Sequence, residues 1–139
     1  GLFALPLAQD YRQVVGVEFD GRSASNAVRG AERNEIANVR FASADVNAWL
    51  GHKRHRHVVP DLVVVDPPRV GLGTELATRL RDRQLTSLTY VSCDPTTLAR
   101  DLKILLAGNL RIQDVAIFDL FPQTHHVETV VRLVDPAAI

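Results

Sequence analysis

The sequence has one cysteine, no methionine, no net charge and no long apolar run. A single cysteine excludes a disulfide framework within the chain and a cysteine-rich metal or iron–sulfur site. It also indicates a reducing compartment, which we expect to be the cytoplasm. No apolar run approaches the roughly 20 residues that span a bilayer, so we expect no membrane partner. The first ten residues lack a basic segment before an apolar one, so we expect no signal peptide.

The charges of the chain cancel, with 16 basic and 16 acidic residues, and hydrophobic residues make up 46% of its 139 positions. This length and composition predict one globular domain at residues 1–139. A protein that holds nucleic acid through its overall field would be strongly basic, so any RNA contact here needs a local patch or another domain. Because methionine is absent even at the start, we expect the chain to be a fragment or a processed product rather than a complete natural chain.

Short β-branched runs alternate with segments of helical periodicity. We expect strands at residues 13–19, 39–44, 62–66, 89–93, 113–118 and 128–134, and helices at 23–33, 45–50, 74–83 and 95–106. This alternation predicts an α/β fold of Rossmann type, mostly parallel, and the last two strands, with no helix between them, predict a terminal antiparallel pair. Residues 1–8 are typical of the end of a glycine loop and the helix after it, so we expect the first strand to be missing from this chain.

Acidic residues lie at or just after the carboxyl ends of three of the expected strands. Glu18 occurs where nucleotide-binding α/β folds have an acid that accepts hydrogen bonds from ribose, and Asp45 follows the next strand, where its carboxylate could lie beside an adenine. The simpler alternatives are a solvated acid for Glu18 and a helix N-cap for Asp45. Asp66 opens the segment DPPR (66–69), whose prolines stiffen the chain and so fix where the acid points. We favour ligand binding over a plain strand terminator, because open α/β sheets bind ligands at the carboxyl ends of their strands.

Cys93 lies between a strand and a helix, in the segment SCDP (92–95). A thiol at a helix N-terminus lies at the positive end of the helix dipole, which favours the thiolate, although Asp94 works against this effect. The alternative is a small buried apolar residue. Glu128, at the start of an apolar strand, is either an edge-strand charge that discourages aggregation or a partly desolvated general base.

Histidine is concentrated in two segments. His125 and His126 are adjacent, and since neighbours in sequence rarely face one site and no third ligand suggests itself, we expect no metal. Residues 52–57 (HKRHRH) form the one basic cluster. Its simplest interpretation is a solvated loop, and its alternative is a phosphate contact.

Together these motifs resemble those of the RNA (uracil-5-)-methyltransferases over nearly the whole chain. The resemblance is carried by a glycine-loop remnant, VE (17–18), AD (44–45), DPPR with GL (66–69, 71–72), SCDPTTLARD (92–101) and FPQTHHVE (121–128). The last two are specific, and the others occur more widely among methyltransferases. The resemblance implies a Rossmann-type catalytic domain, S-adenosylmethionine as cofactor, and tRNA or rRNA as substrate. We expect the accessory N-terminal RNA-binding domain of many members to be missing here.

By position, the resemblance implies that Cys93 is the nucleophile and that Glu128 removes the proton at carbon 5 of uracil. The thiolate would attack carbon 6, which makes carbon 5 nucleophilic toward the methyl group. The implied cofactor contacts are Glu18 at the ribose, Asp45 near the adenine, Asp66 at the amino-acid end, and the backbone of Leu2, which stands where the family usually has a polar residue.

Two alternatives stay open. An amino-group nucleic-acid methyltransferase also has an acid or asparagine before two prolines at this strand end. Those enzymes need an aromatic residue after the prolines and no cysteine, so Arg69 and Cys93 argue against this alternative. The other is a non-catalytic truncated domain that only folds or assists another chain.

Overall fold

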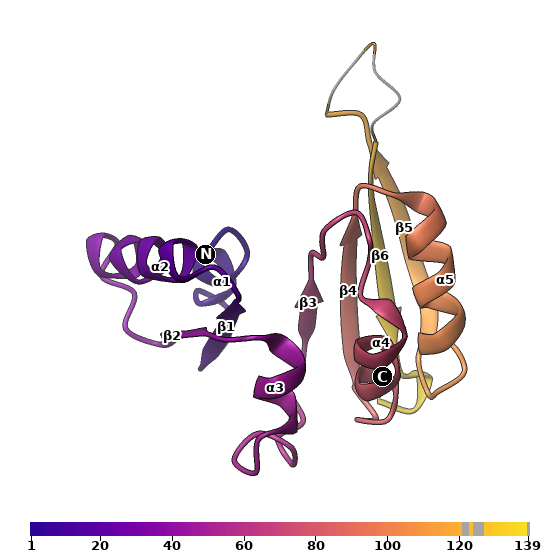
Figure 1. Ribbon diagram of the computed structural model, residues 1–139, viewed down its shortest axis with the longest axis horizontal. Coiled ribbons are helices and arrows are strands. Elements are labelled where there is room, and N and C mark those ends of the chain that lie inside the picture. Colours follow the sequence, from indigo (N-terminus) through magenta and orange to yellow (C-terminus); the bar gives the residue numbers. More distant parts are fainter. Residues whose placement is uncertain (121–122, 124–126, 139) are drawn as a thin grey trace. The chain divides into compact units, whose positions relative to one another are not determined.

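The computed structural model describes residues 1–120, 123 and 127–138. They form two compact units, Gly1–His57 and Val58–Ile139, and each unit has its own hydrogen-bonded sheet (Figure 1). In the described part of the chain, no helix has the length and apolar character to cross a membrane.

The first unit is a two-stranded parallel sheet with helices beside it. Its elements are α1 (Ala4–Leu7), β1 (Val14–Glu18), α2 (Gly21–Arg33), β2 (Val39–Ser43) and α3 (Val46–Gly51). The buried residues of α2 are Ala24, Ala27 and Ala31, which share one helical face because they are three and four residues apart. The opposite face of α2 is polar and exposed, as expected for a surface helix.

Two close contacts fix the inner part of this unit. The side-chain amide of Asn38 donates to the carbonyls of Ala8 and Tyr11, at 2.7 and 2.8 Å, and so ties the turn after α1 to the start of β2. Gly16 of β1 pairs with Phe41 of β2, and a Cβ on Gly16 would lie only 2.6 Å from the Phe41 ring. Glycine is therefore needed at this position for the ring to lie across the strand.

The second unit contains a four-stranded sheet in the order β3-β4-β6-β5. Its elements are β3 (Val63–Val65), α4 (Gly73–Arg81), β4 (Ser87–Ser92), α5 (Pro95–Leu105), β5 (Arg111–Phe118), β6 (Glu128–Val134) and a 3₁₀ turn (Pro136–Ala138). β3 and β4 are parallel, and β6 is antiparallel to both β4 and β5.

One face of this sheet forms the main core. Leu88 and Tyr90 of β4 and their partners Leu133 and Val131 of β6 are almost fully buried. The helices α4 and α5 cover them with their own apolar residues, Leu76, Ala77, Leu80, Leu98 and Leu105. A fully buried leucine of this kind contributes about 2 kcal/mol through removal of apolar surface from water.

The structure confirms the expected order of helices and strands, the α/β class and the antiparallel final pair. It adds that β6 lies between β4 and β5 rather than at the sheet edge. β4 begins at Ser87, two residues before the expected start, and ends at Ser92, so Cys93 lies just beyond the strand. A single domain over residues 1–139 stays a prediction, because each unit is defined by its own internal contacts.

Candidate functional site

Three of the predicted site residues lie at one edge of the four-stranded sheet. Asp66 directly follows β3 and Cys93 directly follows β4, and these two strands are parallel. β6 runs antiparallel to β4 and pairs Thr129 with Ser92, so Glu128 and Cys93 each lie one residue beyond that pair. The strand register therefore brings the thiol and the glutamate to the same end of neighbouring strands.

Cys93 occupies a tightly bonded turn between β4 and α5. Its thiol is free and its side chain is half-buried. The Ser92 hydroxyl donates to the carbonyl of Asp94 at 2.9 Å and accepts from the Asp94 N–H at 3.1 Å. The Asp94 carboxylate caps α5 by accepting from the N–H groups of Thr97 and Thr96, both at 2.9 Å, and the bond from Thr97 lowers the pKa of Asp94. The Asp94 carboxylate, next to the cysteine, is thus hydrogen-bonded to the N-terminus of α5.

The β3–α4 loop, which begins with Asp66, is anchored to α5 by a buried carboxylate. Asp101 is fully buried and accepts hydrogen bonds from the backbone N–H of Leu72 at 2.6 Å and from the Tyr90 hydroxyl at 2.7 Å. The Arg100 guanidinium lies 2.8 Å from the other Asp101 oxygen and also donates to the Val70 carbonyl at 2.7 Å. The loop is therefore held by both side chains at once.

Gly71 allows the loop to approach this carboxylate. Its φ is 75°, a conformation that side-chain-bearing residues rarely adopt, and a Cβ there would overlap the Asp101 carboxylate. The Gly71 N–H donates to the Pro68 carbonyl at 2.8 Å, and the Thr97 hydroxyl donates to the Arg69 carbonyl at 2.9 Å. These bonds fix the path of the backbone immediately after Asp66.

The electrostatics of this edge follow from burial. Burial raises the pKa of Tyr90 well above its usual range, and the hydrogen bond to Asp101 and the charge of that residue raise it further. Partial desolvation also raises the pKa of Asp66, although its side chain reaches the surface. The ionised form of Asp66 is therefore less favoured in the folded chain than in water.

The sequence did not predict a role in the site for Asp101, Tyr90 or Arg100. A signal was present in α5, where Leu98, Asp101 and Leu105 share the buried face. An acid on an apolar helix face needs buried donors, and it could have been marked as a structural anchor for that reason.

Glu18 and Asp45 lie at the carboxyl edge of the other sheet, in the first unit. Glu18 ends β1 and pairs with Ser43 of β2, and Asp45 is two residues beyond Ser43. The Glu18 carboxylate accepts from the Asp20 N–H at 3.3 Å, and the Asp45 carboxylate accepts from the Ala48 N–H at 2.9 Å. Both acids are exposed. Asp45 is therefore the N-cap of α3, as one of its two interpretations expected.

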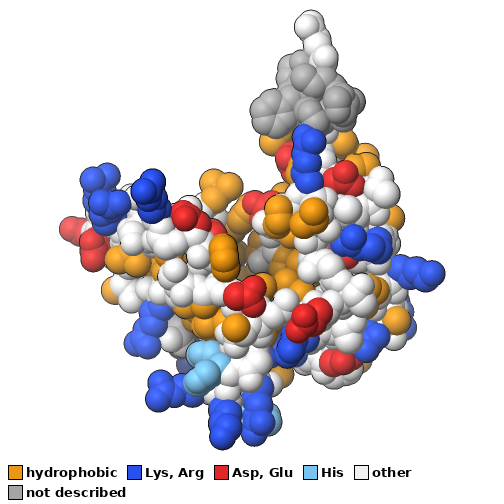
Figure 2. All heavy atoms as spheres, in the orientation of Figure 1, with side chains coloured by type: hydrophobic (Ala, Val, Ile, Leu, Met, Phe, Trp, Pro, Cys, Tyr) orange, Lys and Arg blue, Asp and Glu red, His pale blue; other side chains and the backbone are white. Residues whose placement is uncertain are grey.

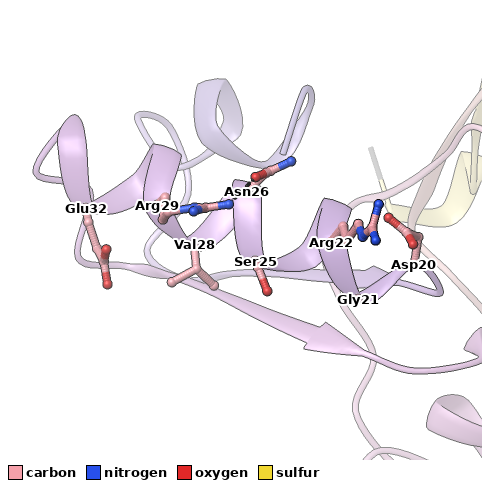
Figure 3. Close-up of a pocket in the computed structure, with 8 residues that line it drawn as sticks. All are labelled: Asp20, Gly21, Arg22, Ser25, Asn26, Val28, Arg29 and Glu32. Carbon is pink, nitrogen blue, oxygen red and sulfur yellow. Dashed lines mark hydrogen bonds between the residues drawn. The ribbon is translucent and has the colours of Figure 1, made fainter.

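The last predicted cofactor residue, Leu2, lies in the turn before α1, with its side chain 77% exposed. A separate hollow runs along α2 (Figure 3). It is lined by Asp20, Gly21, Arg22, Ser25, Asn26, Val28, Arg29 and Glu32. None of the predicted site residues lines it, and apart from Asp20 its walls come from α2 alone. The strand ends therefore stay the candidate site.

Part of the FPQTHHVE motif, residues 121, 122 and 124–126, lies outside the described residues. The two adjacent histidines, His125 and His126, fall in this part. Within residues 1–120, 123 and 127–138, no group of three His, Cys, Asp or Glu side chains is arranged to hold a metal ion.

Comparison with known proteins gives a consistent result. Residues 1–135 match the family model of tRNA (Uracil-5-)-methyltransferase. The chain is 45% identical to an uncharacterized RNA methyltransferase of Gloeobacter violaceus and 39% identical to one of Enterococcus faecalis, each over 133 residues. These alignments cover 96% of this chain but 28% and 29% of the two relatives. The chain thus spans less than a third of their length.

Among solved structures, the chain resembles the Pyrococcus abyssi tRNA (uracil-54, C5)-methyltransferase in complex with S-adenosyl-L-homocysteine. The TM-score is 0.79 and the identity 35%, over 96% of this chain and 32% of that one. Aeropyrum pernix fibrillarin in complex with S-adenosyl-L-methionine has a TM-score of 0.63 at 19% identity, over 88% of this chain and 55% of that one, which shows the fold alone. The methyltransferase type of Rossmann fold is thereby confirmed. With its motifs, its fold and a family model matched from Gly1 to Asp135, the chain belongs to the tRNA (uracil-5-)-methyltransferase family.

Proposed function

We propose that this chain transfers a methyl group from S-adenosylmethionine to carbon 5 of a uridine in tRNA or rRNA, through a covalent bond between Cys93 and the base. The observation that carries the proposal is the register of β4 and β6. Ser92 pairs with Thr129, and Cys93 and Glu128 each lie one residue beyond this pair. Membership of the family supplies the reaction class.

The chemistry needs a nucleophile and a base at the same place. As the Cys93 Sγ bonds to carbon 6, the electron pair of the 5,6 double bond moves into an enolate, and carbon 5 becomes able to take the methyl group. A base must then remove the proton from carbon 5, so that the electron pair left behind re-forms the double bond and expels the thiolate. We assign this step to Glu128, which is half-buried at the start of β6.

The carboxylates at the strand ends suit the cofactor, because they are acceptors and the groups that they would meet are donors. Glu18 would accept from the ribose hydroxyls, Asp45 would lie near the adenine, and Asp66 would accept from the ammonium group. The backbone of Leu2 would complete the set. S-adenosylmethionine would supply the methyl group as an electrophilic sulfonium. The relative from Pyrococcus abyssi, which holds S-adenosyl-L-homocysteine, supports the choice of cofactor.

The test uses RNA that carries 5-fluorouridine, together with S-adenosylmethionine. Fluorine at carbon 5 cannot leave as a proton does, so the covalent intermediate should accumulate and survive denaturation. We expect mass spectrometry to locate the adduct on Cys93, and Cys93→Ala to abolish both the adduct and turnover with little change in cofactor affinity. An adduct on another residue, or turnover in Cys93→Ala comparable to the parent, would refute the assignment.

A further inference from the structure

The basic loop, residues 52–57, is a charged surface segment that the proposed methyl-transfer site does not use. All six residues are Lys, Arg or His, five of them are exposed, and His55 is half-buried. The chain as a whole has no net charge, yet residues 46–60 contain no acid. Positive charge is therefore concentrated in this loop, on three side chains, Lys53, Arg54 and Arg56.

The basic loop has a defined shape. His55 stacks on Trp49 of α3, with ring centroids 4.0 Å apart and ring planes 9° from parallel. The carbonyl of His52 accepts from the backbone N–H groups of His55 and Arg56, at 2.9 and 3.0 Å. These contacts fold the loop back toward α3. A surface that is ordered before it meets a ligand loses less conformational entropy on binding.

Within the loop, the Arg56 guanidinium donates to His57 Nε2 at 2.9 Å, and this bond brings no acidic partner to its positive charge. The ion pairs that join Arg79 to Glu75, Arg81 to Asp82 and Arg100 to Asp101 all lie in the second unit. The end of a helix favours a nearby cation, but α3 has only six residues, and this effect does not require three cations within four residues. Figure 2 shows Lys and Arg side chains gathered together with His side chains on the surface.

We propose that the basic loop binds the phosphate backbone of the RNA substrate and positions that RNA without reading its sequence. The identity of the polyanion rests on the proposed function, whereas the contact itself rests on the charge and shape of the loop. Lys and Arg side chains on an exposed loop can follow successive phosphates, and such contacts set the register of a nucleic acid. Because this chain has no net charge, any attraction that the chain itself exerts on RNA needs a local patch of positive charge.

The test compares the parent chain with a variant that combines Lys53→Gln, Arg54→Gln and Arg56→Gln. Binding of a short uridine-containing RNA hairpin is measured without cofactor, by anisotropy of labelled RNA over a range of salt concentrations. We expect affinity at low salt to fall roughly tenfold or more, and the slope of log affinity against log salt to fall by about three, one for each lost phosphate contact. Trp49, the one tryptophan of the chain, stacks on His55, so its fluorescence should change when RNA binds the parent.

A matched control makes the same change of charge on α2, with Arg22→Gln, Arg29→Gln and Arg33→Gln, all at exposed positions of the same unit. The control should keep most of the affinity and the salt slope of the parent. Equal losses in both variants, or no loss in the loop variant, would overturn the proposal.

Tighter binding of phosphatidylserine vesicles than of RNA, lost in the loop variant, would assign the loop to a lipid surface instead and would also overturn it. Because RNA binding is measured without cofactor, a chain that forms the Cys93 adduct but binds RNA equally well without the loop cations refutes this inference alone. Salt-dependent binding through the loop without any adduct refutes the proposed function alone.

Discussion

The two units of the chain hold their candidate ligand-binding acids by different means. In the second unit, the loop that begins with Asp66 is fixed over a long sequence distance, because Asp101 bonds the backbone of Leu72, 29 residues away. In the first unit, Glu18 and Asp45 bond backbone groups two and three residues away. The sheet edge of the second unit is thus held by a buried core residue, whereas the sheet edge of the first unit is held only by hydrogen bonds within its own turns.

This difference matches what each edge is proposed to do. A thiol that forms a covalent bond must meet its substrate in a fixed geometry, and misplacement of about 1 Å can lower the rate a hundredfold. The turn that carries Cys93 and the loop that follows Asp66 both bond to the same helix, α5. The carboxylates proposed to bind ribose and adenine tolerate more freedom, since hydrogen bonds to exposed groups can adjust.

After Cys93→Ala, the largest effect on turnover is expected from Glu128→Gln, at the sheet edge of the second unit. The amide keeps the size of the side chain but cannot accept the proton from carbon 5, so turnover should fall by roughly a hundredfold or more. The covalent RNA adduct should then accumulate with ordinary uridine, and denaturing gels should detect it. Rapid release of methylated product by this variant would show that another group removes the proton.

Asp101→Ala should cause the largest loss of stability. It leaves the buried Tyr90 hydroxyl and the Leu72 N–H without their acceptor, and it removes the partner of Arg100, so the free energy of unfolding should fall by about 3 kcal/mol. Urea denaturation measures this change.

Asp101→Asn is the matched variant, because it keeps one oxygen acceptor. It should recover part of the lost stability and, with it, part of the rate of adduct formation at Cys93. If Asp101→Ala were as stable as the parent, the contrast between the two edges would have no energetic basis.

The same contrast explains how much the sequence could predict. The order of elements, the N-cap at Asp45 and the edge positions of Asp66 and Cys93 depend on local pattern, and the sequence predicted them. The hydrogen bonds of the Asp101 carboxylate depend on which face of α5 packs against the β3–α4 loop. Tertiary packing decides that. The position of β6 between β4 and β5 was missed for the same reason, since a short link between strands predicts their pairing but not their order in a sheet.

A smaller effect on stability is expected from Asp45→Ala, at the sheet edge of the first unit. Loss of the N-cap of α3 should lower the free energy of unfolding by about 1 kcal/mol. Asp45→Asn keeps a capping oxygen and should retain most of that stability. If the charge of Asp45 contributes to binding near adenine, cofactor affinity measured by calorimetry should fall in both variants. Equal affinity in the parent and in both variants would leave Asp45 with the capping role alone.

Asp66→Asn should give the smallest change in stability, and with the opposite sign to Asp101→Asn. Desolvation raises the pKa of Asp66 above 3.8, so the folded state binds this proton more tightly than the unfolded state does. The free energy of unfolding therefore falls as the pH rises from 3.8 through the raised pKa of the folded state. At neutral pH the ionised carboxylate therefore opposes folding, and its replacement by the neutral amide should raise the urea midpoint slightly. Below pH 3 the two proteins should unfold alike.

Cofactor affinity should nevertheless fall, because the ammonium group loses its anionic partner. A variant that is less stable than the parent at neutral pH would instead mean that Asp66 anchors the fold, as Asp101 does, and is not held ready for a ligand.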